Sequence, residues 1–280
     1  MKFMIESKFM SNIRNLGYRM WSFRFVTFVI MIIFFMDMYL SPFRMNVRIL
    51  GQNCNIAVLP FLQTSDYYMK IAFLGVVYFY SNVPFMEKEE LFYLSRLGKR
   101  GWGWRNICYL IESSLILTIC FLMTSLLEVM SIGKISLSWD SVYKTLSLTG
   151  GQNLQFSISY FIMKEYTPLF LMTLILFMDW MVILFIAMLM YVIGLYGYRI
   201  LSCVIAILIV FLPSIDAWVG GILIYYSPLS WLDCSNWRIG YDNRKPDLPY
   251  MIVAIIFLNM LLLLFGQHYV KKMEWKTSDD

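Results

Sequence analysis

Histidine is nearly missing from this sequence, with one residue in 280, and the five cysteines show no C-x-x-C spacing. Histidines and closely spaced cysteines are the usual ligands of zinc, so their scarcity argues against a metal site. His268 follows the last apolar run beside Lys271 and Lys272, which is the position of an interfacial residue rather than a ligand or base. Three cysteines lie within apolar runs as small apolar residues, while Cys54 and Cys234 fall in connecting segments and could pair.

Signatures of several enzyme classes are missing too. The sequence has no G-x-x-x-x-G-K-[ST], so it does not bind ATP through a P-loop, and it has neither G-x-S-x-G nor H-E-x-x-H. No polar stretch exceeds about 40 residues, which is below the ~50 residues of a small soluble domain. N-x-[ST] sequons are absent, as is compatible with a bacterial source. We expect no catalytic residue and no cofactor in this chain.

Apolar residues dominate what is present. They make up 60% of the chain and the mean hydropathy is +0.65, against roughly 45–50% apolar residues in soluble domains. A hydrocarbon core about 30 Å thick needs roughly 20 apolar residues per helix. β-Barrel alternation is absent, so the sequence predicts an all-α membrane protein, a single transmembrane domain over residues 1–280. Six runs are predicted to span the bilayer, at residues 25–40, 67–85, 107–130, 168–193, 200–218 and 249–267.

Basic residues predict the orientation of these helices. Five precede the first run, five lie between the second and third, Arg199 lies between the fourth and fifth, and three follow the sixth. These are 14 of the 23 lysines and arginines. Eight bases lie on the opposite face, spread over longer connections. The positive-inside rule therefore predicts that both termini are cytoplasmic in a multi-pass plasma-membrane protein.

The N-terminal segment, residues 1–20, carries an apolar stripe of Phe9, Ile13, Leu16 and Met20, which is typical of a helix lying in the membrane interface. A disordered basic tail is the alternative interpretation. A cleaved signal peptide is disfavoured, because no small-x-small site follows the first apolar run.

The exterior connections differ in character. Residues 41–66 are mixed, and residues 131–167 are long and polar. In residues 220–248, an apolar stretch too short to span precedes the sixth run. It predicts a short re-entrant or interfacial helix, with a buried loop as an equal alternative.

Five acids lie within or at the edges of the predicted spans: Asp37, Glu112, Glu128, Asp179 and Asp216. Ionisable groups there are costly and usually face the bundle interior or water. Most lie near helix ends, and no two converge as an aspartyl protease would require. Asp179 lies nearest mid-membrane, as a candidate functional acid or as a structural hydrogen-bonding group.

Residues 87–97 form a short polar segment between the second and third runs. Leu91, Leu94 and Leu97 repeat at helical spacing, which predicts a short amphipathic helix at the membrane surface. Such a helix suits the docking of a cytoplasmic partner. The candidate docking residues are Glu87, Glu89, Glu90, Leu91, Leu94, Arg96 and Arg100.

This organisation resembles the ABC-2 type (type V) permease family. Residues 85–90, Phe-Met-Glu-Lys-Glu-Glu, and residues 94–102, Leu-Ser-Arg-Leu-Gly-Lys-Arg-Gly-Trp, look like that family's coupling-helix region and its Trp-containing entry to the third span. Residues 218–230 resemble its re-entrant exterior helices. The likeness covers nearly the whole chain as architecture and about 20 residues as motif. The long segment 131–167 departs from compact family members.

The resemblance implies the transmembrane subunit of an ATP-driven exporter. Separate cytoplasmic ABC ATPase subunits would carry ATP and Mg, and two permease subunits, identical or different, would form the pathway in the bilayer. No nucleic-acid partner is expected. Two other function classes remain open: a non-transporting membrane scaffold or immunity protein, and an integral membrane enzyme.

The candidate pathway residues are Tyr78, Asp179 and Asp216. The second and fifth runs combine aromatic and polar groups, which suits amphipathic cargo. The alternative is that the tyrosines near the ends of the second run anchor it at the interface.

Overall fold

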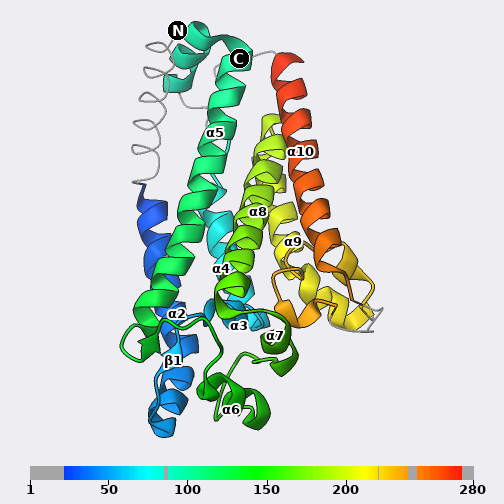
Figure 1. Cartoon of the computed structure of the whole chain (residues 1–280). Helices are drawn as coiled ribbons and strands as arrows, with labels where there is room; N and C mark the ends of the chain where they lie inside the picture. The colour runs from blue at the N-terminus through cyan, green and yellow to red at the C-terminus, as the bar shows by residue number, and fades with distance from the viewer. Residues whose placement is uncertain (1–21, 85–87, 220, 239–244, 273–280) are drawn as a thin grey trace.

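The computed structural model describes residues 22–84, 88–219, 221–238 and 245–272. These residues form mainly helices, and five of the helices are long and apolar enough to cross a membrane (Figure 1). This architecture is consistent with an all-α, multi-pass membrane protein. The five are α2 (Phe23–Leu50), α5 (Lys88–Val129), α8 (Pro168–Leu195), α9 (Arg199–Val219) and α10 (Leu248–Lys272).

The second predicted span is shorter than expected. Helix α4 (Asp66–Tyr80) has 15 residues, about 22 Å at ~1.5 Å per residue, whereas the apolar core of a bilayer is about 30 Å thick. A turn at Ser81 ends the helix, and Pro84, which cannot donate to a helical hydrogen bond, follows. Among the described residues, five helices rather than the six predicted therefore satisfy the length of a spanning helix.

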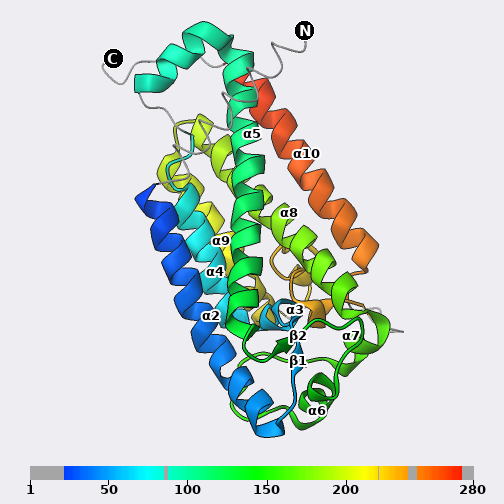
Figure 2. The same cartoon turned by 60° about the vertical axis from the view of Figure 1, so that its left-hand side comes forward.

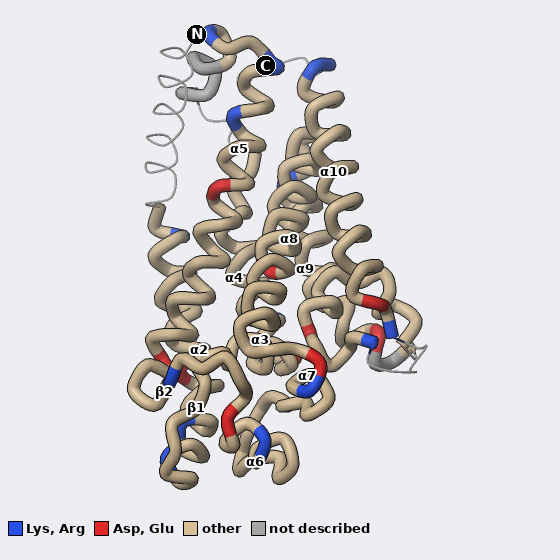
Figure 3. Tube along the Cα trace, in the orientation of Figure 1, with Lys and Arg blue, Asp and Glu red and all other residues tan. Residues whose placement is uncertain are grey.

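The six helices alternate in direction along the bundle. Helices α2, α5 and α9 run one way and α4, α8 and α10 the other (Figures 1 and 2). We call the end where α5 breaks at Gly98 the Gly98 end, and the opposite end, where α6 (Ser141–Thr149) lies, the α6 end. Charged residues gather towards these two ends, and the middle of the bundle is largely uncharged (Figure 3).

Helix α8 is the centre of the core. It packs against α4, α5, α9 and α10. Val182, Ile183, Ile186, Ala187 and Met190 are all fully buried in successive turns. A helix that is apolar all round is expected in such an interior position.

Close packing between α2 and α4 depends on Gly75. A Cβ atom at this position would overlap the side chain of Met31 and crowd Phe28. The absence of a side chain lets the two helices approach closely.

Helix α2 extends ten residues beyond its predicted end at residue 40. Pro42, two residues beyond the predicted end, lies inside the helix. The Asn46 side chain donates to the Pro42 carbonyl at 2.8 Å, and Gly51 ends the helix in the left-handed conformation, with φ of 64°.

The α6 end carries a layer of short elements. Strands β1 (Cys54–Asn55) and β2 (Gly133–Lys134) pair in parallel, Cys54 opposite Gly133. Around them lie α3 (Leu59–Leu62), α6, α7 (Tyr160–Glu165) and the 3-10 helices η1 (Leu223–Tyr225) and η2 (Cys234–Asn236). In the apolar stretch of residues 220–226, the described part thus contains a three-residue 3-10 helix.

Aromatic rings hold this layer to the helices. Tyr143 lies 5.2 Å from Trp139, 5.6 Å from Phe43 and 5.7 Å from Phe61, measured between ring centroids. Its hydroxyl donates to the Asn55 carbonyl at 2.9 Å. The long segment 131–167 is therefore a packed part of the fold and not a loose loop.

Candidate functional site

The segment 88–97 is helical and is set apart from the rest of α5 by Gly98. Gly98 has φ of 68° and ψ of 169°, a conformation that only glycine adopts readily. The chain bends there, so that the first part of α5 crosses over the Gly98 end while the remainder descends through the bundle (Figure 2). The break thus produces a short surface helix that continues directly into a spanning one.

The predicted docking residues divide by exposure. Leu94 is partly buried against the protein's own core, whereas Arg96, Leu97 and Arg100 are exposed, Leu97 to 44%. Of the apolar stripe, Leu94 therefore packs against the protein itself, and Leu97 is exposed at the surface. Glu87 lies outside the described residues, as do the side chains of Glu89, Glu90 and Leu91.

Asp179 is fully buried in α8 and is held by one side chain. The Gln63 Nε2 atom donates to both carboxyl oxygens, at 2.7 and 2.6 Å. Gln63 caps the C-terminus of the short helix α3, so this contact joins the α6-end layer to the central helix. The structural interpretation of Asp179, an inter-element hydrogen bond, is the one this geometry supports.

Two buried acceptor or donor atoms beside Asp179 have no hydrogen-bond partner among the described residues. They are the Gln63 Oε1 atom and the hydroxyl of Tyr68, a side chain that is 2% exposed. Buried polar atoms are rarely left unpaired, so the cluster has capacity for one more hydrogen-bonding group.

Asp216 has a local structural role near the end of α9. Its Oδ1 atom accepts from the Leu223 amide at 2.7 Å, and its carbonyl accepts from the Gly221 amide at 3.2 Å. These bonds hold the turn that leads into η1. The Asp216 carboxylate therefore satisfies the backbone of a helix-to-loop transition.

Tyr78 lies near the Gly98 end of α4 and is 43% exposed. The guanidinium carbon of Arg24 lies 5.8 Å from its ring centroid, and Arg24 also donates to the Ser81 hydroxyl at 2.6 Å. A cation stacked on an aromatic ring beside a helix end is typical of an interfacial anchor. Tyr78, Asp179 and Asp216 thus have separate partners on separate elements and do not form one cluster.

Comparisons of the chain with family models, with curated proteins and with solved structures gave no match.

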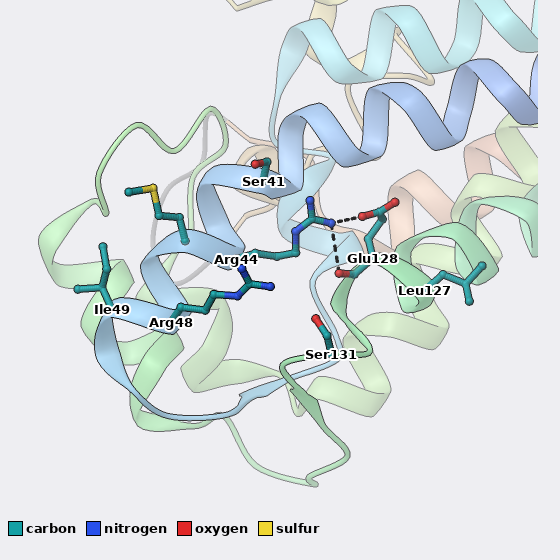
Figure 4. A pocket seen from close by; sticks show the side chains of 8 residues that line it. Ser41, Arg44, Arg48, Ile49, Leu127, Glu128 and Ser131 are labelled. Atoms are coloured by element: carbon teal, nitrogen blue, oxygen red, sulfur yellow. Dashed lines mark hydrogen bonds and ion pairs between the residues drawn. The ribbon is translucent and has the colours of Figure 1, made fainter.

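An ion-paired groove on α2 and α5 was not anticipated as a site. Arg44 contacts the carboxylates of Asp37 and Glu128, and its Nη1 atom also lies 3.4 Å from the Glu128 carbonyl (Figure 4). The sequence places both acids near the ends of predicted spans but does not indicate a basic partner for them. The sequence feature that could have indicated this ion pair is the position of Arg44, seven residues after Asp37 on the same helix.

The groove has a volume of about 700 Å³ and opens to the outside at the α6 end. The polar side chains lie in the middle of the groove, with Ile49 on one side of them and Leu127 on the other (Figure 4). The lining residues are Ser41, Arg44, Met45, Arg48, Ile49, Leu127, Glu128 and Ser131.

Cys54 and Cys234 are both buried free thiols. The Cys54 sulfur faces the Ile132 carbonyl at 3.7 Å and the Cys234 sulfur faces the Pro60 carbonyl at 3.5 Å. Burial raises the pKa of Cys54 to about 12 and that of Cys234 well above its usual value. Thiolate formation is suppressed, so these cysteines act as packing residues.

Within the part of the chain that the structure describes, no three His, Cys, Asp or Glu side chains gather in a metal-binding cluster.

Proposed function

We propose that this chain is the transmembrane permease subunit of an ATP-binding-cassette exporter in the cell membrane. ATP and Mg would bind to a separate cytoplasmic ATPase, and a second permease subunit would complete the substrate pathway. The observation that carries the proposal is the helical segment 88–97, set off from a spanning helix at Gly98.

A short surface helix continuous with a membrane helix is suited to transmit force. Movement of a partner bound to residues 88–97 would be passed through the Gly98 bend to α5, which packs against α2, α8 and α10. Three exposed groups, Arg96, Leu97 and Arg100, give this segment both charge and apolar surface for a partner groove.

The arrangement of helix directions supports the same proposal. With α4 counted as a short sixth crossing, the chain enters and leaves the bundle at the Gly98 end. This end would be the cytoplasmic one, and both termini would lie there. Residues 1–20 would form the interfacial helix, which lies outside the described residues.

The test is association with an ATPase. Tagged protein purified from its native membrane should bring with it a P-loop ATPase, and the complex should hydrolyse ATP. Leu97→Asp should weaken this association about 10- to 100-fold, because it removes roughly 1.5–3 kcal/mol of apolar burial in the partner. We choose Leu97 because Leu94 packs against the protein's own core.

Leu148→Asp is the matched control, since Leu148 is 79% exposed at the α6 end. It should leave ATPase association unchanged. Equal association in the Leu97→Asp variant would refute the docking assignment. If no ATPase accompanies the wild-type protein, a non-transporting scaffold or immunity protein becomes the better interpretation.

A further inference from the structure

The groove between α2 and α5 contains a cation that the fold does not use. Arg44 is held by two acids, but Arg48, one turn further along α2, is exposed, and its guanidinium group has no hydrogen bond or ion pair among the described residues. In Figure 4 its guanidinium group is directed to the side of the groove where Ser131 lies. An arginine and hydroxyl groups facing one open cavity form a suitable site for an anionic oxygen group.

The depth of this groove matches the phosphate layer of a bilayer. Arg24 lies in the first turn of α2 and Arg44 lies twenty residues later, about 30 Å along the helix, which equals the thickness of the apolar core. Arg48 lies about 6 Å further out along the same helix. The headgroup region begins at this level.

An apolar track leads from the groove towards the middle of the bundle. Helix α5 exposes Leu127, Met123 and Ile119 at a spacing of four residues, and α2 exposes Met38 and Phe34 on the face that Met45 occupies. Residues at this spacing share one face of a helix. Exposed apolar side chains on both helices thus lead from the groove towards the middle of the bundle.

We propose that this groove binds a phospholipid, with the phosphate on Arg48 and Ser131 and an acyl chain along α2 and α5. The positive charge of Arg48 favours a phosphate group. The exposed apolar side chains on α2 and α5 favour binding of a lipid over a free anion. Arg44 and Glu128 keep the two helices together beneath the headgroup. This site is separate from the proposed docking of an ATPase, because it lies at the opposite end of the bundle.

The test uses the purified full chain, stripped of lipid in detergent, and native mass spectrometry. Phosphatidylglycerol should be retained by the wild-type protein, and Arg48→Gln should lower its affinity at least fivefold. Lys144→Gln is the control, since Lys144 is an exposed base at the same end but outside this groove. The control should bind phosphatidylglycerol as the wild-type protein does.

Two further probes separate the possible occupants. Diacylglycerol, which has no phosphate, and inorganic phosphate, which has no acyl chain, should each bind much more weakly than phosphatidylglycerol. Retention of full affinity in Arg48→Gln, or equal binding of either partial probe, would overturn the proposal. Disulfide cross-linking between two copies through Ile49→Cys in lipid nanodiscs would also overturn it, because a second copy would then cover the groove.

Discussion

The pair Gln63–Asp179 places a hydrogen-bonded amide and carboxyl group in the buried core. Gln63 and Asp179 are 3% and 0% exposed, so neither can turn to water if the other is lost. Removal of one partner from such a buried pair costs more than removal of both, because it leaves a desolvated polar group without a hydrogen bond. The hydrogen bonds between Gln63 and Asp179 therefore hold α3 against α8.

We predict that Gln63→Leu lowers the free energy of unfolding by about 2–5 kcal/mol, since the Asp179 carboxyl then loses both of its bonds. The double variant Gln63→Leu/Asp179→Leu should be more stable than Gln63→Leu alone. Unfolding of the purified protein in detergent measures both. If the losses in free energy of unfolding from the two single substitutions add up to the loss in the double variant, Gln63 and Asp179 are not coupled.

Asp233 gives a pH-dependent prediction. Burial raises the pKa of this carboxyl to about 6, although a hydrogen bond from Ser235 partly offsets the shift. A raised pKa means that the folded state holds the proton more tightly than the unfolded state. The stability contributed by Asp233 is therefore complete below about pH 4 and is lost as the pH rises through 6.

Asp233→Asn should remove this dependence, because an amide keeps the capping bond without titrating. A difference of about two pKa units corresponds to about 3 kcal/mol, which water at this half-buried carboxyl reduces to on the order of 1–2 kcal/mol. Relative to wild type, the variant should gain that amount between pH 4 and pH 7 in thermal unfolding. Asp247→Asn, at an exposed acid of the same segment, should not reproduce the gain.

At the scale of elements, Gly98 determines how the surface helix meets α5. An alanine there meets no other atom, but its φ of 68° and ψ of 169° would cost about 1–3 kcal/mol, so the chain is expected to rearrange towards a continuous helix. Gly98→Ala should therefore reduce ATPase association at least tenfold in a co-purification assay, without preventing membrane insertion.

The matched control for this change is Gly150→Ala at the C-cap of α6. Gly150 also has a positive φ, of 75°, and open space around it, but it lies at the opposite end of the bundle. An equal loss in both variants would mean that general destabilisation, and not the bend, causes the effect.

The sequence predicted helices best where apolar runs were long. It located α8 and α9 to within two residues of their observed ends, although α9 contains Pro213, because both apolar runs are long and are bounded by polar or glycine-containing turns. It failed at α2 and α4, where a proline was tolerated inside one helix and the other stopped at Ser81. Propensity could not decide the case of α2, because Pro42 removes one backbone hydrogen bond while Leu40, Phe43 and Val47 around it are buried in the core.

The sequence did not predict which individual side chains contact each other. Asp179 was singled out from its depth alone, and its partner Gln63 lies 116 positions away on an element too short to predict. Arg44 and Glu128 are similarly 84 positions apart. Such contacts depend on how helices are arranged in space, which apolar periodicity does not encode.

At the scale of the whole molecule, the orientation can be tested by labelling. A cysteine at Lys272 should react with an impermeant maleimide only after the membrane is permeabilised, and a cysteine at Leu148 should react in intact cells. The wild-type chain, whose own cysteines are buried or half-buried, gives the background. Labelling of Lys272→Cys in intact cells would place the Gly98 end outside and would remove the proposed docking with it.

The pairing of β1 with β2 has a mechanical consequence. Two backbone bonds, Cys54 to Ile132 at 3.1 Å and Ile56 to Lys134 at 3.3 Å, cross-brace the segments that follow α2 and α5, just beyond the Arg44–Glu128 contact. These backbone hydrogen bonds therefore hold the ends of α2 and α5 together, and we expect the two helices to move as one unit there. We therefore expect slow hydrogen exchange at the amides of Cys54 and Ile56, because breaking their bonds requires the ends of α2 and α5 to separate.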